Sequence, residues 1–155
     1  EKESQWVNAW QARLNIPVVT AGMAVATALK TLGVRRLDLL SPYPGDLTQA
    51  SVAYWVSHGF DIGTVQSVNS SDPGFHAIYT TSSESANSAA QALSATSADA
   101  VLMLGTGMPT LSPIARTPYV GRAPVMSCML AIVWASVALW SLGWHCCLQP
   151  RRAMA

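Results

Sequence analysis

Apolar and polar positions along the chain form two kinds of pattern, one typical of strands and one typical of helices. Short runs that indicate buried strands occupy residues 15–22, 34–43, 61–68, 99–107 and 123–128. Segments with a helical pattern lie between and around them, at residues 1–14, 23–33, 45–60, 84–98 and 129–144. Strands that alternate with helices predict an α/β fold, in which a parallel sheet is covered by helices on both faces.

Details within these segments predict how they pack and where they end. The first helical segment places Trp6, Trp10 and Leu14 on one face, a spacing that predicts core packing. Either Asp46 or Thr48 is predicted to cap the helix at 45–60, whose end carries His58 as a solvated side chain. Residues 69–85 are polar and interrupted by Gly and Pro, which predicts a loop.

The run from residue 123 to residue 144 contains no charged side chain and is long enough to span a bilayer. Pro124 and the pair at 127–128 divide this run. We therefore expect a buried strand over 124–127 and a separate helix over about 129–142, the pattern of an α/β core. A membrane protein anchored by this segment is the less favoured alternative, and the arginines at 151 and 152 fit it.

Composition narrows the classes of protein and ligand. Half of the residues are hydrophobic and only 11% are charged, which indicates extensive burial. The formal net charge of +1 offers no electrostatic basis for nucleic-acid binding. Three cysteines, two of them adjacent, form neither a disulfide framework nor a zinc motif, so we expect reduced thiols in a cytoplasmic protein without a metal.

Small and polar residues stand where four of the predicted strands end, at 20–22, 41–43, 105–107 and 127–128. The carboxyl ends of parallel strands meet at one edge, where α/β proteins bind ligands. The Gly-Thr-Gly turn at 105–107 is predicted to bind an anion through backbone N–H groups, with a tight turn that binds nothing as the alternative. It lacks the further glycines or the Gly-Lys pair of nucleotide-phosphate loops, so a nucleotide is not favoured.

Three stretches, IPVVTAGMAVATALKTLGVRRLDLLSPY, ADAVLMLGTGMPTL and APVMSCMLAIVWASV, resemble the aspartate/glutamate racemase superfamily. Within it they are most similar to the branch of maleate cis–trans isomerase and arylmalonate decarboxylase, over roughly residues 5–140. The resemblance implies a flavodoxin- or Rossmann-like half of a fold built from two such halves around a cleft. It also implies a cofactor-independent enzyme that acts on small carboxylates or dicarboxylates.

The chain departs from the family pattern by apparently lacking most of the first half. The resemblance divides it into a remnant of that half at 1–22, consisting of a helix and a strand, the second half at 23–143, and an irregular tail at 144–155. A second departure is at Gly105, which stands where the family usually carries a catalytic cysteine, so the thiol is absent.

The resemblance also assigns roles to single residues of the site. Tyr43 is similar to the tyrosine that binds the substrate carboxylate, and Thr106 and Gly107 are similar to turn residues whose N–H groups donate to it. Thr20 would lie where the last strand of the first half meets the cleft, and Asn69 resembles an asparagine that contacts substrate in the isomerases.

Three functions are compatible with these features. The first is a racemase-superfamily isomerase or decarboxylase that works at the α-carbon or double bond of a small (di)carboxylate and is inactive as this chain. The second is a non-catalytic α/β module that binds a carboxylate or a partner, and the third is the tail-anchored membrane protein. Exposed apolar surface at the place of the missing half would favour homo-oligomers.

Overall fold

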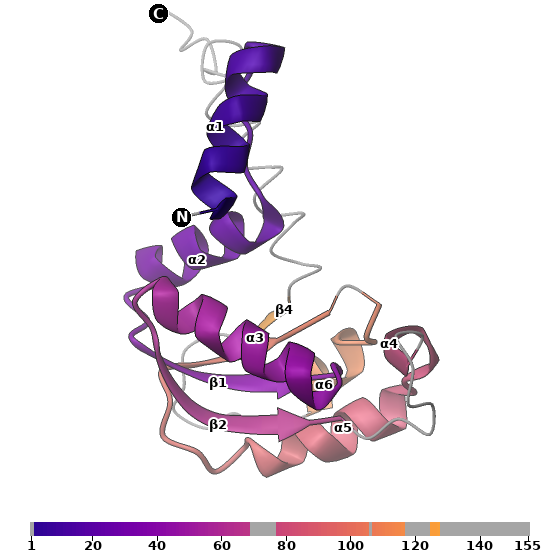
Figure 1. Cartoon of the computed structure of the whole chain (residues 1–155). Helices are drawn as coiled ribbons and strands as arrows, with labels where there is room; N and C mark the ends of the chain where they lie inside the picture. The colour runs from indigo at the N-terminus through magenta and orange to yellow at the C-terminus, as the bar shows by residue number, and fades with distance from the viewer. Residues whose placement is uncertain (1, 69–76, 106, 117–124, 128–155) are drawn as a thin grey trace, which may run out of the picture.

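The computed structural model describes residues 2–68, 77–105, 107–116 and 125–127. Its elements are α1 (Lys2–Leu14), α2 (Ala21–Thr31), β1 (Arg36–Ser41), α3 (Gly45–Ser57), β2 (Asp61–Ser67), α4 (Ala77–Thr80), α5 (Ser83–Ala92), β3 (Ala100–Met103), α6 (Leu111–Arg116) and β4 (Val125–Ser127). The four strands form one parallel sheet in the order β2-β1-β3-β4 (Figure 1). The structure confirms the α/β class.

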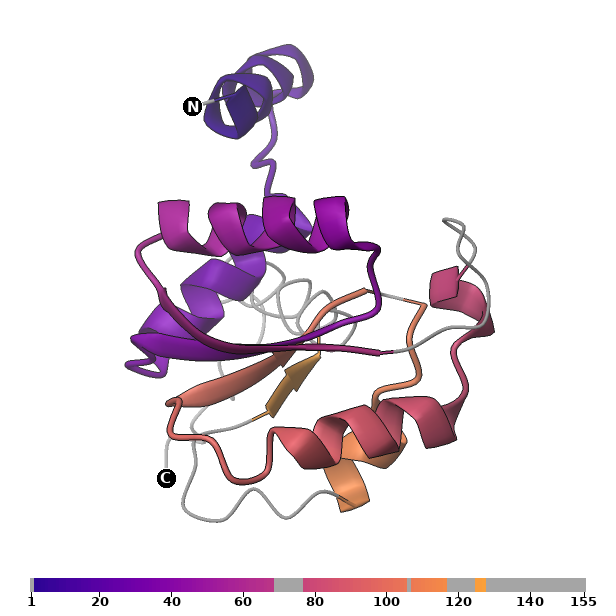
Figure 2. The ribbon, with the colours of Figure 1, turned by 60° about the horizontal axis from the view of Figure 1, so that its bottom comes forward.

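The core lies on both faces of the two central strands. Alternate residues of β1 and β3 face opposite sides, so Leu39 and Leu102 join one apolar cluster while Leu40 and Met103 join the other. The first cluster is closed by residues of α2 and α3 and the second by residues of α5. Figure 2 shows these helices above and below the sheet. All four residues of β3 are buried, as expected of a strand covered on both sides.

The strand β4 settles one question about the apolar run at 123–144. Val125–Ser127 pairs in parallel with β3, so the run is not one continuous helix, as the sequence predicts. The helix expected at 129–142 lies outside the described residues. Within the described part of the chain, every helix is too short or too polar to cross a bilayer.

The strand predicted at 15–22 is wrong. Asn15 takes a φ of 52° directly after α1, and no strand of the described sheet pairs with the residues that follow. The amide of Val18 donates instead to Oε1 of Gln11 at 3.1 Å. Thr20 is the N-cap of α2, where its side chain accepts a hydrogen bond from the amide of Met23. The apolar residues here therefore belong to a connection between two helices.

The prediction that the first helical face packs into the core is also wrong, although the helix itself forms. Trp6 is 56% exposed and Leu14 is 49% exposed, and Val7 is the only residue of α1 classed as buried. In Figure 1, α1 projects away from the sheet rather than lying against it. The aromatic face of α1 therefore meets little of the described structure.

The loop predicted at 69–85 is shorter than expected where the structure describes it. Residues 77–80 form α4, and α5 begins at Ser83 after an N-cap at Ser82, whose hydroxyl accepts from the amide of Ser85 at 3.1 Å. Serine at an N-cap is favoured because its oxygen satisfies an amide that the helix leaves without a partner. The serines that suggested a loop therefore start a helix, and residues 69–76 lie outside the described part.

Candidate active site

The order of the strands creates a switch point between β1 and β3. The chain leaves β1 through α3 to reach β2 on one side, and it then returns through α5 to β3 on the other side of β1. The helix α3, which follows β1, covers one face of the sheet, and α6, which follows β3, contacts α5 on the other face, so the connections that follow β1 and β3 diverge (Figure 2). Open α/β sheets bind ligands in the crevice that such a divergence leaves at the carboxyl ends of the strands.

An open pocket of about 440 Å³ lies at this switch point. Its walls come from the ends of β1 and β3, the first turns of α3 and the short helix α4. The lining residues are Tyr43, Leu47, Ala50, Ser51, Ile78, Tyr79 and Gly105. A volume in this range accommodates a small organic molecule. The described part of the lining has no charged side chain, so a bound carboxylate would be held by hydroxyl groups and backbone N–H groups.

A network of hydrogen bonds fixes the turn that carries Tyr43. The hydroxyl of Thr48 donates to the carbonyl of Tyr43 at 3.0 Å and lies 2.7 Å from the hydroxyl of buried Ser41. The Ser41 hydroxyl in turn accepts from the amide of Tyr43 at 3.3 Å. The Tyr43 side chain packs against the apolar cluster under α3 and also lines the pocket. Ser41 and Thr48 therefore position Tyr43.

This network corrects the predicted cap of α3. Neither Asp46 nor Thr48 is the N-cap; Pro44 holds that position and makes no side-chain hydrogen bond to the helix. The Thr48 hydroxyl is already bonded within the turn, while Asp46 lies in the first helical turn. The negative charge of Asp46 still favours this end of the helix through the helix dipole.

Gly105 lies just after the end of β3, in a conformation that suits glycine. Its φ is +81°, and a β-carbon there would lie 2.9 Å from Cγ of Pro42. Side chains other than glycine rarely adopt this φ, and the contact with Pro42 is closer than β-carbons tolerate. The glycine therefore lets the turn pass close under Pro42 at the floor of the pocket. A cysteine could enter this position only with strain.

The structure brings together some of the sequence-predicted site residues and separates others. Tyr43 and Gly105 line the same pocket, and a β-carbon at Gly107 would meet the ring of Tyr79, which lines it as well. Thr20 is not part of this lining; its hydroxyl contacts Glu3 of α1. Thr106 and Asn69 lie outside the described residues.

Sequence reasoning missed the contribution of α4. Ile78 is 6% exposed and Tyr79 is 67% exposed, and both line the pocket opposite the start of α3. The available signal was an adjacent aliphatic and aromatic residue inside an otherwise polar segment. Binding residues are often carried by loops that a rigid scaffold positions, which made this pair a candidate.

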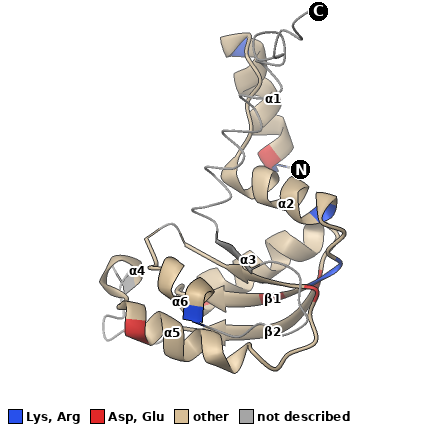
Figure 3. Cartoon of the chain, turned by 180° about the vertical axis from the view of Figure 1, so that it is seen from behind, with Lys and Arg blue, Asp and Glu red and all other residues tan. Residues whose placement is uncertain are grey.

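Charged side chains in the described part of the chain are scattered. Figure 3 shows the acidic and basic residues spread singly over the helices and the strand ends, without a concentrated basic face in the described part. The described residues also contain no group of three or more His, Cys, Asp or Glu side chains close enough to hold a metal ion.

Comparison with known proteins places this fold. The family model for arylmalonate decarboxylase matches residues 2–149. A crystal structure of arylmalonate decarboxylase is 24% identical with a TM-score of 0.75, over 88% of this chain and 60% of that one. A mutant maleate cis–trans isomerase from Nocardia farcinica, solved with a covalently bound succinylcysteine intermediate, is 24% identical with a TM-score of 0.75, over 90% of this chain and 58% of that one.

A maleate isomerase from Pseudomonas putida S16, solved with maleate, is 23% identical with a TM-score of 0.67, and the match covers 81% of this chain and 50% of that one. The chain thus spans about 60% or less of the length of these structures. No curated protein sequence matches it. The structural likeness establishes a shared fold, and the family match extends over nearly the whole sequence. The chain therefore belongs to the arylmalonate decarboxylase family.

Proposed function

We propose that this chain is the carboxylate-binding half of an isomerase- or decarboxylase-type enzyme whose substrate is a small carboxylate or dicarboxylate. The observation that carries the proposal is the pocket at the β1/β3 switch point, which joins Tyr43 to the glycine turn at 105. The relatives of known structure support the substrate class, because one was solved with maleate and another with a succinylcysteine intermediate.

The pocket suits the binding step of such chemistry. A turn rich in glycine presents backbone N–H groups to a ligand, and a tyrosine hydroxyl adds a donor. Donors fixed in this way stabilise negative charge that develops on a carboxylate or an enolate during reaction, provided that they are held rigidly. The bonds from Ser41 and Thr48 to the Tyr43 turn supply that rigidity.

The described part of this pocket's lining offers no group for proton transfer. Proton transfer at carbon needs a positioned acid or base, and the described lining contains no cysteine, histidine or carboxylate. We therefore propose that this chain alone binds carboxylates without converting them. A cytoplasmic location remains part of this proposal and rests on the sequence alone.

Binding and turnover are tested separately on the full chain. Maleate and phenylmalonate are titrated while ¹⁵N chemical shifts are followed, and both compounds are then incubated with the protein and analysed for products. We expect saturable shifts for residues of the pocket, at least about tenfold weaker binding in Tyr43→Phe, and no product. Tyr54→Phe is the matched control, because Tyr54 is not among the lining residues of this pocket.

Two results would contradict the proposal. Equal affinity in the wild type and Tyr43→Phe would remove the tyrosine from the site. Product formation at an enzymatic rate by the unaltered chain would show that the acid or base is present after all. If binding is normal and no product forms, the non-catalytic module that the sequence also allows describes this chain.

A further inference from the structure

The helix α1 is attached to the rest of the described structure at few points. Its aromatic face is turned outward, and its one buried side chain is Val7. The bond between Gln11 and Val18 reaches only the segment that follows the helix. A helix of 13 residues is marginal in water when nothing holds it. Its helical state therefore depends on the contacts made near its start.

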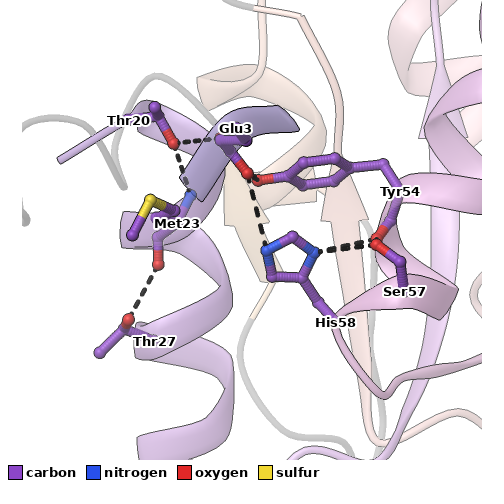
Figure 4. Close-up of polar contacts among 7 residues, drawn as sticks. All are labelled: Glu3, Thr20, Met23, Thr27, Tyr54, Ser57 and His58. Atoms are coloured by element: carbon purple, nitrogen blue, oxygen red, sulfur yellow. Dashed lines mark hydrogen bonds and ion pairs between the residues drawn. The ribbon is translucent and has the colours of Figure 1, made fainter. Parts of the chain in front are cut away.

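Glu3 makes those contacts. Its Oε1 accepts a hydrogen bond of 2.5 Å from the hydroxyl of Thr20, which caps α2. The hydroxyl of Tyr54 on α3 lies 3.0 Å from Oε2 and 3.2 Å from Oε1 of the same carboxylate. Figure 4 shows the three side chains converging from α1, the start of α2 and α3. One carboxylate thus bridges three elements.

The groups that surround the Glu3 carboxylate favour a negative charge. The Thr20 hydroxyl accepts from the amide of Met23 while it donates to Glu3, and the amino end of α2 favours a negative charge. The Tyr54 ring stacks on the ring of His58, with centroids 4.3 Å apart, and Nε2 of His58 is 3.9 Å from Oε2 of Glu3. Nδ1 of His58 lies 3.0 Å from the carbonyl of Tyr54, which fixes the ring.

We propose that Glu3 is a clasp that holds α1 against α2 and α3, so that α1 can be released as a unit while the sheet stays folded. Hydrogen bonds to an ionised carboxylate are roughly twice as strong as neutral ones. The clasp contacts only the outer layer of helices. The two apolar clusters at the sheet contain no residue of α1.

Hydrogen exchange on the full chain tests the clasp, with peptides from residues 2–14 compared with peptides that cover β1 and β3. In Glu3→Gln we expect exchange of the α1 amides to rise about tenfold while the amides of β1 and β3 keep their rates. Glu3→Asp retains the charge at the helix start but shortens the reach to Tyr54, and we expect the same loss. Glu84→Gln changes an acidic residue in the first turn of α5 and serves as the matched control.

Three outcomes would overturn the clasp. Unchanged exchange of α1 in Glu3→Gln would show that other contacts hold the helix. Equal acceleration in α1 and in the sheet would make Glu3 a contributor to global stability only. Wild-type exchange in Glu3→Asp would reduce its role to the helix dipole. Tyr54→Phe keeps the ring and removes one donor, so acceleration confined to α1 in this variant would confirm the partner.

Discussion

A β-carbon at Gly22 on α2 would lie 2.1 Å from the hydroxyl oxygen of Tyr54 on α3. Only a glycine allows the first turn of α2 to pass so close to this ring, which places the Tyr54 hydroxyl within reach of Glu3. The two helices therefore pack closely because a glycine on α2 leaves room for an aromatic ring on α3.

Gly22→Ala is expected to destabilise the fold despite the better helix propensity of alanine. The methyl group would push the Tyr54 ring away and break its bonds to Glu3, at a cost of about 1–3 kcal/mol in the free energy of unfolding. Urea denaturation measures the change. Gly45→Ala is the control, because a β-carbon there meets nothing within 4 Å and α3 gains helix propensity. A neutral Gly22→Ala would contradict the close contact.

Thr48→Val is expected to loosen the turn that carries Tyr43. The substitution keeps the size of the side chain but removes the donor to the Tyr43 carbonyl, so we expect a loss of about 1–2 kcal/mol in stability. Carboxylate binding should weaken as well, because Tyr43 loses its fixed position. Thr27→Val removes a hydroxyl that donates to the carbonyl of Met23 on the exposed side of α2, and it should change neither quantity. Equal effects in both variants would exclude a positioning role for Thr48.

The central sheet could be predicted because its signal is local and strong. The run at 99–107 is apolar on both faces, and β3 is buried on both faces for that reason. The connection at 15–22 looked the same in the sequence, yet a strand also needs a neighbour to pair with. None of the described strands lies beside it. Periodicity reveals apolar residues but does not show which partner buries them, and the exposed face of α1 has the same explanation.

The candidate site could be predicted at the ends of β1 and β3, because parallel strands bring their carboxyl ends together. The opposite wall of the pocket could not be predicted. Ile78 and Tyr79 approach the pocket through the position of α4, which no sequence spacing specifies. The sequence also predicts Thr20 at the cleft, as a strand end. In the structure, Thr20 caps the amino end of α2, because the chain turns into that helix there. The positive φ of Gly105 also became visible only in three dimensions.

The free energy of unfolding should decrease in strong alkali, because Tyr54 ionises there. Burial, reinforced by the hydrogen bond and the charge of Glu3, raises the pKa of Tyr54 from 10.0 to about 12. The folded state thus favours the neutral phenol, so this contribution is complete below pH 10 and is lost as the pH rises from 10 through about 12. The difference between the tyrosinate absorbance of the wild type and that of Tyr54→Phe should titrate near the upper value. A midpoint near 10 would show that the hydroxyl is not held by Glu3.

Stability in acid should depend on Asp99. Its carboxylate accepts hydrogen bonds of 2.9 Å from the backbone amides of Arg35 and Arg36, and these bonds lower the pKa of Asp99 below 3.8. Because Asp99 is exposed and water screens its interactions, we expect Asp99→Ala to cost at most about 1 kcal/mol of stability at neutral pH. Because the folded pKa is depressed, this difference should persist down to about pH 3.8 and shrink as the pH falls through the lower folded value.

Urea denaturation of Asp99→Ala at several pH values measures this contribution. Asp61→Ala, at the exposed start of β2, is the control and should stay within about 0.5 kcal/mol of the wild type. A loss in Asp99→Ala that stays constant down to the acid limit would show that the ionised carboxylate does not make these bonds.

Association between copies should depend on the outward face of α1. Trp6 is 56% exposed, and its ring meets that of Trp10 edge-on at 5.9 Å, so the pair presents apolar surface beside Leu14. A tryptophan buries about 150–250 Å² when it is covered, and its removal should weaken self-association by at least about tenfold. Sedimentation velocity over a range of concentrations, with the wild type and Trp6→Ser, measures this change. Leu32→Ser is the matched control, because Leu32 at the end of α2 is 51% exposed and lies apart from that face. If Leu32→Ser weakens association as much as Trp6→Ser does, the effect reflects general surface hydrophobicity. If neither substitution changes the sedimentation of a chain that associates, the contact between copies lies elsewhere.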